Sequence, residues 1–235
     1  MRRTQLLGTM FALIAGLAMT GTILSQQYTE SSSTITVSVS EPEIADPPLD
    51  IGKNFTADIT VKSVNNLYTW QAGMIFNANV LEVLSFTEGS FLKHGGSTLW
   101  VNGTIDNTNG IIVYHASTLV GNVTGAGGNG ALGTIPFKVK QYGNSTLHLA
   151  NVILLDSTLS EYTEVTLKDY TVIIKIPGDI NGDNIVHILD LNPLGKAYGS
   201  TPGTPNWNPD ADINQDNIVD DADLAFLSEN YGKTT

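Results

Sequence analysis

Cysteine is absent from the 235-residue sequence. Its absence excludes disulfide bridges, thiolate metal sites and cysteine nucleophiles. Basic residues are scarce as well, because 11 Lys and Arg stand against 23 Asp and Glu, for a formal net charge of −12. A protein that binds nucleic acid needs a basic surface to meet the phosphates. Nucleic acid is therefore excluded as a partner.

Catalytic patterns are also missing. The sequence contains no Ser/His/Asp arrangement, phosphate-binding loop or metal triad, and His94, His115 and His148 are scattered along it. The acidic residues outside the C-terminal quarter show no spacing that nominates an acid/base couple. We therefore predict that the protein is not an enzyme. Its 41% of apolar residues are still enough to bury a core.

The N-terminus holds a long apolar run. Arg2 and Arg3 precede an uncharged, mostly apolar stretch over residues 6–24, the order typical of an export signal. A bilayer span needs roughly 20 residues, so this run is long enough to cross one. Residues 1–25 are thus predicted to be a cleaved signal peptide or a retained membrane anchor, with 26–33 as a linker. Either alternative predicts an extracellular or cell-surface protein whose membrane contact is limited to this segment.

Residues 34–176 have the pattern of β-strands. Apolar and polar residues alternate over 55–61, 68–76 and 135–139, and a period of two indicates strands with one buried face. Trp70 shares its face with Tyr68 and Phe76, which favours burial in the core. Turns rich in Asn and Gly separate the runs. Many short strands at this spacing predict a jelly-roll β-sandwich.

Residues 178–235 differ sharply, with ten acidic and two basic residues and hence a net charge of −8. They contain an internal repeat with an offset of 33 residues, in which 179–190 aligns with 212–223. The match continues to Tyr198-Gly199 and Tyr231-Gly232. The spacing of oxygen-bearing residues is that of a twelve-residue EF-hand-like calcium loop. We predict a small α-helical module with two such loops.

In each loop, positions 1, 3, 5 and 12 offer side-chain oxygens, position 7 a backbone carbonyl, and position 9 a ligand through water. Asn184 and Asn217, at position 6, are expected to have positive φ. Ile185 and Ile218 are also expected to join the two loops on their buried side. The predicted ligands of two Ca²⁺ ions are Asp179, Asn181, Asp183, Ile185 and Asp190 in the first loop, Asp212, Asn214, Asp216, Ile218 and Asp223 in the second, and His187 and Asp220 through water.

Two features depart from a common EF-hand: position 12 is Asp, and no helix is expected before either loop. This duplicated form, over residues 178–233, resembles the dockerin modules of cellulosome-type assemblies. The strand patterns at 51–55, 66–71 and 79–83 make residues 34–176 resemble a cohesin domain. The resemblance implies a mainly β two-domain protein, in which a jelly-roll sandwich binds dockerins through one sheet face.

A helix is predicted over 221–231 with Gly232 as its C-cap, whereas Pro193 and Gly195 should weaken the helix after the first loop. Dockerins often carry Ser-Thr at loop positions 10 and 11, where they contact a cohesin. The residues here are different, so Ile188 and Leu189 either contact a partner or belong to the core. The candidate partner-binding residues are Ile188, Leu189, Lys196, Asp221 and Ala222.

The resemblance implies non-catalytic scaffolding by a calcium-dependent cohesin–dockerin interaction. Partners would be cohesin- or dockerin-bearing proteins, including this chain itself, head to tail. One alternative is a carbohydrate-binding sandwich that the dockerin delivers to a scaffold, with polysaccharide as ligand in polysaccharide catabolism. Another is a structural cell-surface protein whose calcium loops only rigidify its C-terminal module.

Overall fold

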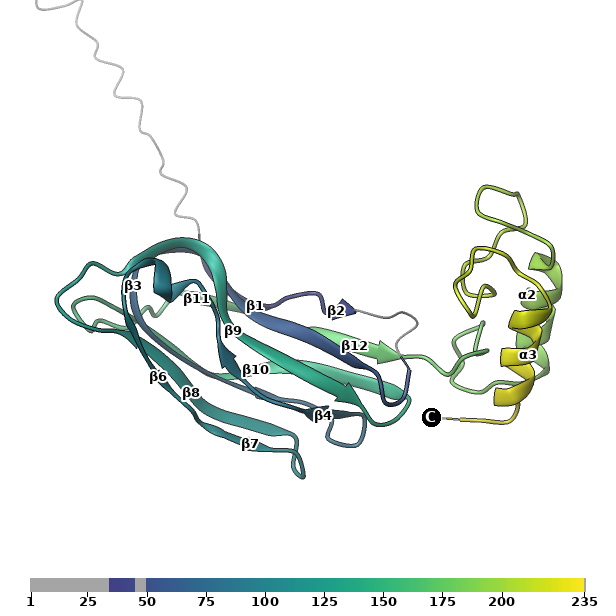
Figure 1. Cartoon of the computed structure of the whole chain (residues 1–235), viewed down its shortest axis with the longest axis horizontal. Coiled ribbons are helices and arrows are strands. Elements are labelled where there is room, and N and C mark those ends of the chain that lie inside the picture. Colours follow the sequence, from purple (N-terminus) through teal and green to yellow (C-terminus); the bar gives the residue numbers. More distant parts are fainter. Residues whose placement is uncertain (1–33, 45–49, 235) are drawn as a thin grey trace, which may run out of the picture. The chain divides into compact units, whose positions relative to one another are not determined.

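The computed structural model describes residues 34–44 and 50–234 (Figure 1). The predicted signal peptide or anchor and the linker lie outside this range. None of the helices within it is long and apolar enough to cross a membrane. The elements are β1 (Ile35–Val39), β2 (Glu43–Ile44), β3 (Asn54–Ile75), β4 (Leu81–Val83), β5 (Thr87–Glu88), η1 (Leu92–His94), β6 (Thr98–Val101), β7 (Thr104–Asp106), β8 (Ile111–Leu119), β9 (Ala126–Val139), β10 (Gly143–Asp156), β11 (Val165–Lys168), β12 (Tyr170–Ile174), α2 (Ile188–Ala197) and α3 (Asp221–Asn230).

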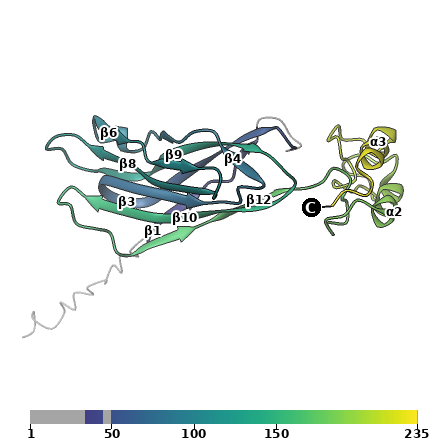
Figure 2. The ribbon, with the colours of Figure 1, turned by 90° about the horizontal axis from the view of Figure 1, so that it is seen from below.

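The strands form a β-sandwich whose two layers share the long strand β3 (Figures 1 and 2). The first part of β3 pairs with β1, β2 and β9, and its last part pairs with β8 and β10. β11 extends the first layer beside β1, and β4 and β5 extend it beside β9. β12 extends the second layer beside β10, and β6 and β7 extend it beside β8. The mainly β fold predicted from the alternating runs is confirmed.

The core of the sandwich lies between the layers. Alternate residues of β3 point into it in the first part of the strand, such as Phe55 and Ile59, and in the last part, such as Trp70 and Met74. Between residues 61 and 70, where the register with β9 shifts, the buried residues are three positions apart. Trp70 is fully buried, which confirms its predicted place in the core. Trp100 packs beside it, with ring centroids 5.7 Å apart. The period-two pattern therefore corresponds to one face turned toward the facing layer.

Gly73 lies between two β-bulges in the second layer. Ala72 pairs with His115 and Met74 with Ile112, so two residues of β8 oppose Gly73. On the other side, the register between β3 and β10 shifts after Ala150. A Cβ at position 73 would lie 2.4 Å from the carbonyl oxygen of Ile112. Only glycine fits this closely approached backbone.

The two layers differ in the charge of their strands. β6, β8, and β3 from Leu67 onward contain no Lys, Arg, Asp or Glu, and β10 contains none before Asp156. The first layer, by contrast, carries Asp58 and Lys62 on β3 and Lys138 on β9. We call the outward side of the second layer the aliphatic face. Its exposed apolar residues are Ile75, Leu99, Val101, Ile111, Tyr114, Ile153 and Ile173.

His115 is a buried titratable group beneath that face. Its ring stacks on Phe86 with centroids 4.3 Å apart, and its Nδ1 accepts a 3.2 Å hydrogen bond from the Gly103 N–H. Its Nε2 has no hydrogen-bond partner among the described residues. Burial lowers the pKa of His115 below its ordinary value, because burial opposes the charged form of an imidazole.

Acidification should therefore destabilise the sandwich through His115. The unfolded chain takes up this proton near pH 6.5 and the folded chain only at lower pH, so the stabilisation is present above pH 6.5 and is lost as pH falls through the folded pKa. The expected loss is about 1.4 kcal/mol for each unit that separates the two pKa values. Urea unfolding of the native protein and of His115→Gln at a series of pH values would measure it. Equal pH dependence in both proteins would contradict the assignment.

The C-terminal module consists of two loops, each followed by a ten-residue helix, and α2 and α3 lie side by side (Figures 1 and 2). α3 ends one residue before the predicted boundary, and Gly232 after it has φ 83°. Pro193 lies within α2, yet that helix is as long as α3. Pro193 has no N–H, so the carbonyl of Leu189 lacks its helical donor. Leu189 is exposed, and water can therefore hydrogen-bond to that carbonyl.

Candidate metal centre

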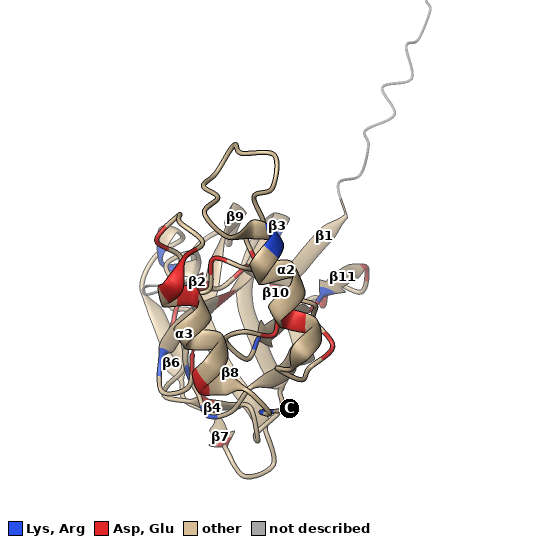
Figure 3. Cartoon of the chain, turned by 90° about the vertical axis from the view of Figure 1, so that its right-hand side faces the viewer, with Lys and Arg blue, Asp and Glu red and all other residues tan. Residues whose placement is uncertain are grey.

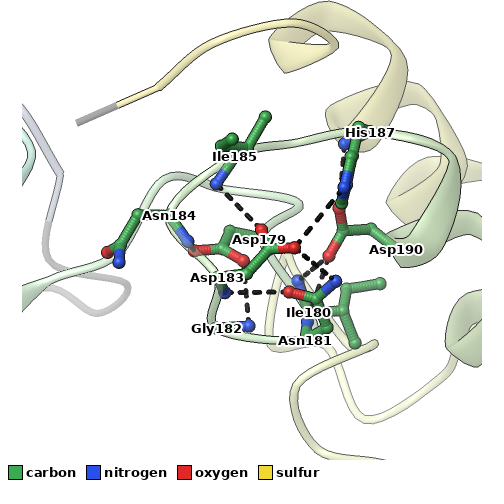
Figure 4. A network of polar contacts seen from close by, with 9 residues as sticks. All are labelled: Asp179, Ile180, Asn181, Gly182, Asp183, Asn184, Ile185, His187 and Asp190. Carbon is green, nitrogen blue, oxygen red and sulfur yellow. Dashed lines mark hydrogen bonds and ion pairs between the residues drawn. The ribbon is translucent and has the colours of Figure 1, made fainter.

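The first loop gathers its side-chain oxygens around its own backbone (Figure 4). The Asp179 carboxylate accepts hydrogen bonds from the N–H groups of Gly182 and Asn184, at 2.9 and 3.0 Å. Asn181 Oδ1 accepts one from Asp183, and Asp183 Oδ1 accepts one from Ile185. These bonds curl the chain into a ring with the oxygens of positions 1, 3 and 5 on its concave side.

Asp190 closes this ring from the first turn of α2. Its carboxylate is fully buried and accepts hydrogen bonds from the N–H groups of Ile180, Asn181 and His187, at 2.8 to 3.0 Å. Burial alone would raise the pKa of Asp190, but these donors and the His187 ring outweigh it and hold the pKa below the usual value. The carboxylate is thus kept ionised.

His187 stands between two of the predicted ligands. Its Nδ1 lies 3.1 Å from Asp190 Oδ2 and its Nε2 lies 3.4 Å from Asp183 Oδ2. One ligand atom from each of these three residues falls within 4.8 Å of the other two. The sequence placed His187 at a position that acts through water, and the structure places its ring at the edge of the same cluster (Figure 4).

The second loop repeats these bonds 33 residues later with one exception: Asp212 accepts from the N–H of Asp216, at position 5, where Asp179 accepts from that of Gly182, at position 4. Asp223 is fully buried and accepts from the N–H groups of Ile213, Asn214 and Asp220. Asp212 accepts from Asp216 and Asn217, at 3.1 and 3.0 Å. Asn214 and Asp216 again accept from the residues two positions further on. The two loops are therefore close structural copies of each other.

Charge crowding is evident at Asp212. Burial raises the pKa of this carboxyl, and the neighbouring carboxylates of Asp223 and Asp216 add to the effect, against the hydrogen bond from Asn217. Figure 3 shows red acidic segments on α2 and α3, with few blue basic ones. A cation among the three carboxylates would remove this repulsion.

The turn geometry of both loops agrees with the sequence. Asn184 and Asn217 have φ of 68° and 70°, as predicted for position 6. Gly182 and Gln215, at position 4, have positive φ as well, which the sequence analysis did not foresee. No helix precedes the first loop within the part of the chain that the structure describes, where β12 leads into it.

The prediction that Ile185 and Ile218 join the loops on their buried side is wrong. Their side chains are 40% and 45% exposed, and it is the next residues, Val186 and Val219, that are fully buried. Val186 exchanges backbone hydrogen bonds with Gly232 and Lys233, and Val219 does so with Gly199 and Ser200. Each loop is thus paired with the segment that follows the helix of the other repeat. We call this arrangement the crossed clasp.

The candidate partner-binding residues lie at the surface of this module. Ile188 and Leu189 are 61% and 58% exposed, so of the two alternatives left open, membership of the core is excluded. Lys196 is exposed near the end of α2, and Asp221 and Ala222 are exposed at the start of α3. Asp221 is held by a hydrogen bond from the Tyr198 hydroxyl.

The donor set of each loop fits calcium. Each offers three carboxylates and an amide oxygen, and hard oxygen donors suit Ca²⁺ better than a transition metal. The position 12 carboxylate of each loop is fully buried, and a buried charge needs a compensating partner.

Comparison with protein families places both parts of the chain. A model described as a cohesin domain matches residues 43–174, more than half of the chain, and one described as a dockerin type I domain matches residues 177–230. This chain belongs to the cohesin family. Its sandwich is a cohesin domain, and a type I dockerin domain follows it. No curated protein matches the chain.

Solved cohesins share low sequence identity with this chain. A non-cellulosomal cohesin from Archaeoglobus fulgidus is 17% identical, with a TM-score of 0.46, over 59% of this chain and 89% of its own. The third ScaC cohesin of Acetivibrio cellulolyticus, solved with the ScaB dockerin, is 16% identical with a TM-score of 0.48. The Coh-OlpA–Doc918 complex of Clostridium thermocellum is 14% identical with a TM-score of 0.47. The last two matches each cover 60% of this chain and 98% of theirs.

The family assignment fixes the class of activity. Cohesin and dockerin domains are non-catalytic modules of cellulosome-type protein–protein assembly, and their partners bear dockerins or cohesins. Type I dockerin domains bind calcium, and such modules are typical of extracellular cellulosome components.

Sequence reasoning missed the aliphatic face as a candidate site. The signal was present in the sequence, since residues 67–75, 98–101, 111–119 and 143–155 contain no charged residue. In a chain with a net charge of −12, a solvent-exposed sheet face whose nearest acid is Asp106 on β7 is a candidate interaction surface.

Proposed function

We propose that this chain is an exported, non-catalytic assembly protein with a calcium-dependent dockerin domain. Two Ca²⁺ ions would be held by the paired loops, and the folded dockerin domain, over residues 178–233, would dock on a cohesin. The cohesin domain, over residues 34–176, would in turn receive a dockerin. The observation that carries this proposal is the fully buried carboxylate at position 12 of both loops, Asp190 and Asp223.

The roles of the residues follow from the loop geometry. The carboxylates at positions 1, 5 and 12 would neutralise the ion, the Asn at position 3 and the carbonyl of Ile185 or Ile218 would complete the oxygen shell, and His187 and Asp220 would act through water. Calcium supplies charge neutralisation alone. The chain itself supplies the ring of backbone N–H donors that aims these oxygens.

On the cohesin domain we assign the dockerin-binding surface to the aliphatic face. The strand register sets its rows: Leu99 lies beside Thr118, and Val101 beside Ala116. The absence of charge from these strands removes the desolvation penalty that charged side chains would bring to a buried interface. The first layer, with Asp58, Lys62 and Lys138, lacks that advantage.

Capture experiments test this assignment. The full chain, immobilised with calcium, is expected to bind purified dockerins from a panel, and Val101→Lys should weaken that binding at least tenfold, since it places a charge on the proposed interface. Lys62→Glu, on the outward side of the other layer, serves as the matched control and should leave binding unchanged. Equal effects of the two substitutions would refute the choice of face. Binding of the chain's own dockerin domain to purified cohesins should require calcium.

The polysaccharide-binding alternative finds less support. A carbohydrate platform uses a row of exposed aromatic side chains, and within the described part of the cohesin domain Tyr114 is the one aromatic residue that is mostly exposed. An extracellular or cell-surface location, with membrane contact limited to residues 1–25, remains part of the proposal.

A further inference from the structure

Two exposed apolar surfaces of this chain lie on different domains. One is the aliphatic face of the cohesin domain and the other is the start of α2. We propose that the chain associates with itself head to tail, with Ile188 and Leu189 of one copy seated on the aliphatic face of a second copy around Tyr114. This proposal rests on the proposed function and names the partner for both surfaces.

The start of α2 presents two strongly exposed apolar side chains on an acidic domain. Ile188 and Leu189 are among its most exposed apolar side chains, whereas residues 178–235 carry a net charge of −8. The equivalent residues of the second repeat are Asp221 and Ala222. The two repeats, so similar in their loops, therefore differ at the place where each would meet a partner.

The second repeat is also engaged internally at this point. The Tyr198 hydroxyl, from the end of α2, donates a hydrogen bond to the Asp221 carboxylate. The residues equivalent to Tyr198 and Asp221 under the 33-residue offset are Tyr231 and Ile188, and the Ile188 side chain offers no acceptor for such a bond. An ionised Asp221 would lose its solvation on an uncharged sheet. The first repeat is thus the one suited to the aliphatic face.

Tyr114 marks the centre of the receiving surface. Ile112 and His115 on either side of the bulge are both buried, so Val113 and Tyr114 both face outward, opposite Gly73. Tyr114 is 61% exposed and has φ 60°, an uncommon conformation for a bulky residue. Such strain is often retained at binding sites, where bulges re-aim a side chain. The residue opposite it, Gly73, has no side chain to fill the surface there.

A second copy suits both surfaces because one chain carries both members of the pair. Two residues, Lys175 and Ile176, separate the matched cohesin domain (43–174) from the matched dockerin domain (177–230), and they span about 7 Å when extended. A strand of eight residues runs about 26 Å, so a return of the dockerin domain onto its own sheet face would strain the link. A contact between different surfaces of two copies leads to open chains or closed rings.

Sedimentation of the full chain tests the proposal. With calcium, the average mass should rise with protein concentration, and with chelator the chain should stay monomeric. The double variant Ile188→Asp with Leu189→Ala gives the first repeat the residues of the second. The second loop already carries Asp and Ala at these positions, as Asp221 and Ala222. The double variant should weaken association at least tenfold. The control Glu229→Gln, at an exposed position of α3 outside the candidate partner-binding residues, should not.

A mixing experiment separates a lost interface from a damaged fold. Tyr114→Asn should also abolish association, yet Asn accepts positive φ, so thermal unfolding should show no loss of stability. The Tyr114→Asn chain and the double variant at Ile188 and Leu189 should each be monomeric alone. Their mixture should form one-to-one dimers, because the α2 start of the first and the aliphatic face of the second are both intact. A native chain that stays monomeric with calcium, or a mixture that stays monomeric, overturns the proposal. If that chain still binds calcium and captures panel dockerins, the proposed function stands and self-association alone fails.

Discussion

Removal of calcium is expected to unfold the dockerin domain and leave the cohesin domain folded. The dockerin core consists of few residues, of which Ile176, Val186 and Val219 are among the most buried. A core in a domain of this size rarely supplies more than about 3–5 kcal/mol. Without a cation, the repulsion among the six loop carboxylates opposes folding.

Hydrogen exchange measured with calcium and then with chelator would show this directly. Amides of the loops, α2 and α3 should lose protection by several orders of magnitude, since they open with the whole domain. The strands of the cohesin domain, which enclose a much larger core, provide the internal control. Full protection of residues 179–233 after exhaustive metal removal would contradict the calcium-dependent assembly proposed above.

The second large effect is expected from the carboxylates at position 12. Asp190→Ala leaves three backbone N–H donors without an acceptor, those of Ile180, Asn181 and His187. An unsatisfied buried donor costs about 1–3 kcal/mol. The Ile180 N–H is buried and the other two are partly buried, so the dockerin domain should lose about 1–3 kcal/mol of stability from the Ile180 donor and less from each of the other two. Its first loop should also lose its ion.

Titration calorimetry would compare Asp190→Ala with Asp223→Ala, the same change in the second repeat. Each should bind one ion fewer than the native chain, and the two should behave alike because their hydrogen bonds match. Glu229→Ala, on the exposed side of α3, is the control and should bind calcium as the native chain does. Unchanged stoichiometry in either Asp variant would remove that residue from the ligand set.

The sequence alone predicts the calcium loops in detail, because a loop of this kind is local. Its ligands, its positive φ at Asn184 and its buried closing carboxylate all lie within twelve residues, so spacing carries the geometry. The ligand roles themselves stay predictions until a metal is bound. The strands are predicted as a class for a similar reason, since alternation reports burial.

The contacts between distant segments were beyond prediction. Sequence favoured Ile185 and Ile218 as the link between the loops, although Val186 and Val219 fill that place, because nothing local reveals which of two adjacent apolar residues turns inward. The bulges beside Gly73 are likewise a matter of register between strands far apart in the chain. Tyr114 could not be placed without them.

The crossed clasp has a consequence for how fast the dockerin domain forms. Val186 and Gly232, which pair directly, are 46 positions apart (232 − 186), so a domain with only local helices nevertheless depends on distant contacts. High contact order slows folding, since the entropy of loop closure is lost before the distant hydrogen bonds and contacts form. Neither repeat can complete its pairing alone. We therefore expect refolding on calcium addition to be a single concerted step, slower than for a helical bundle of equal length.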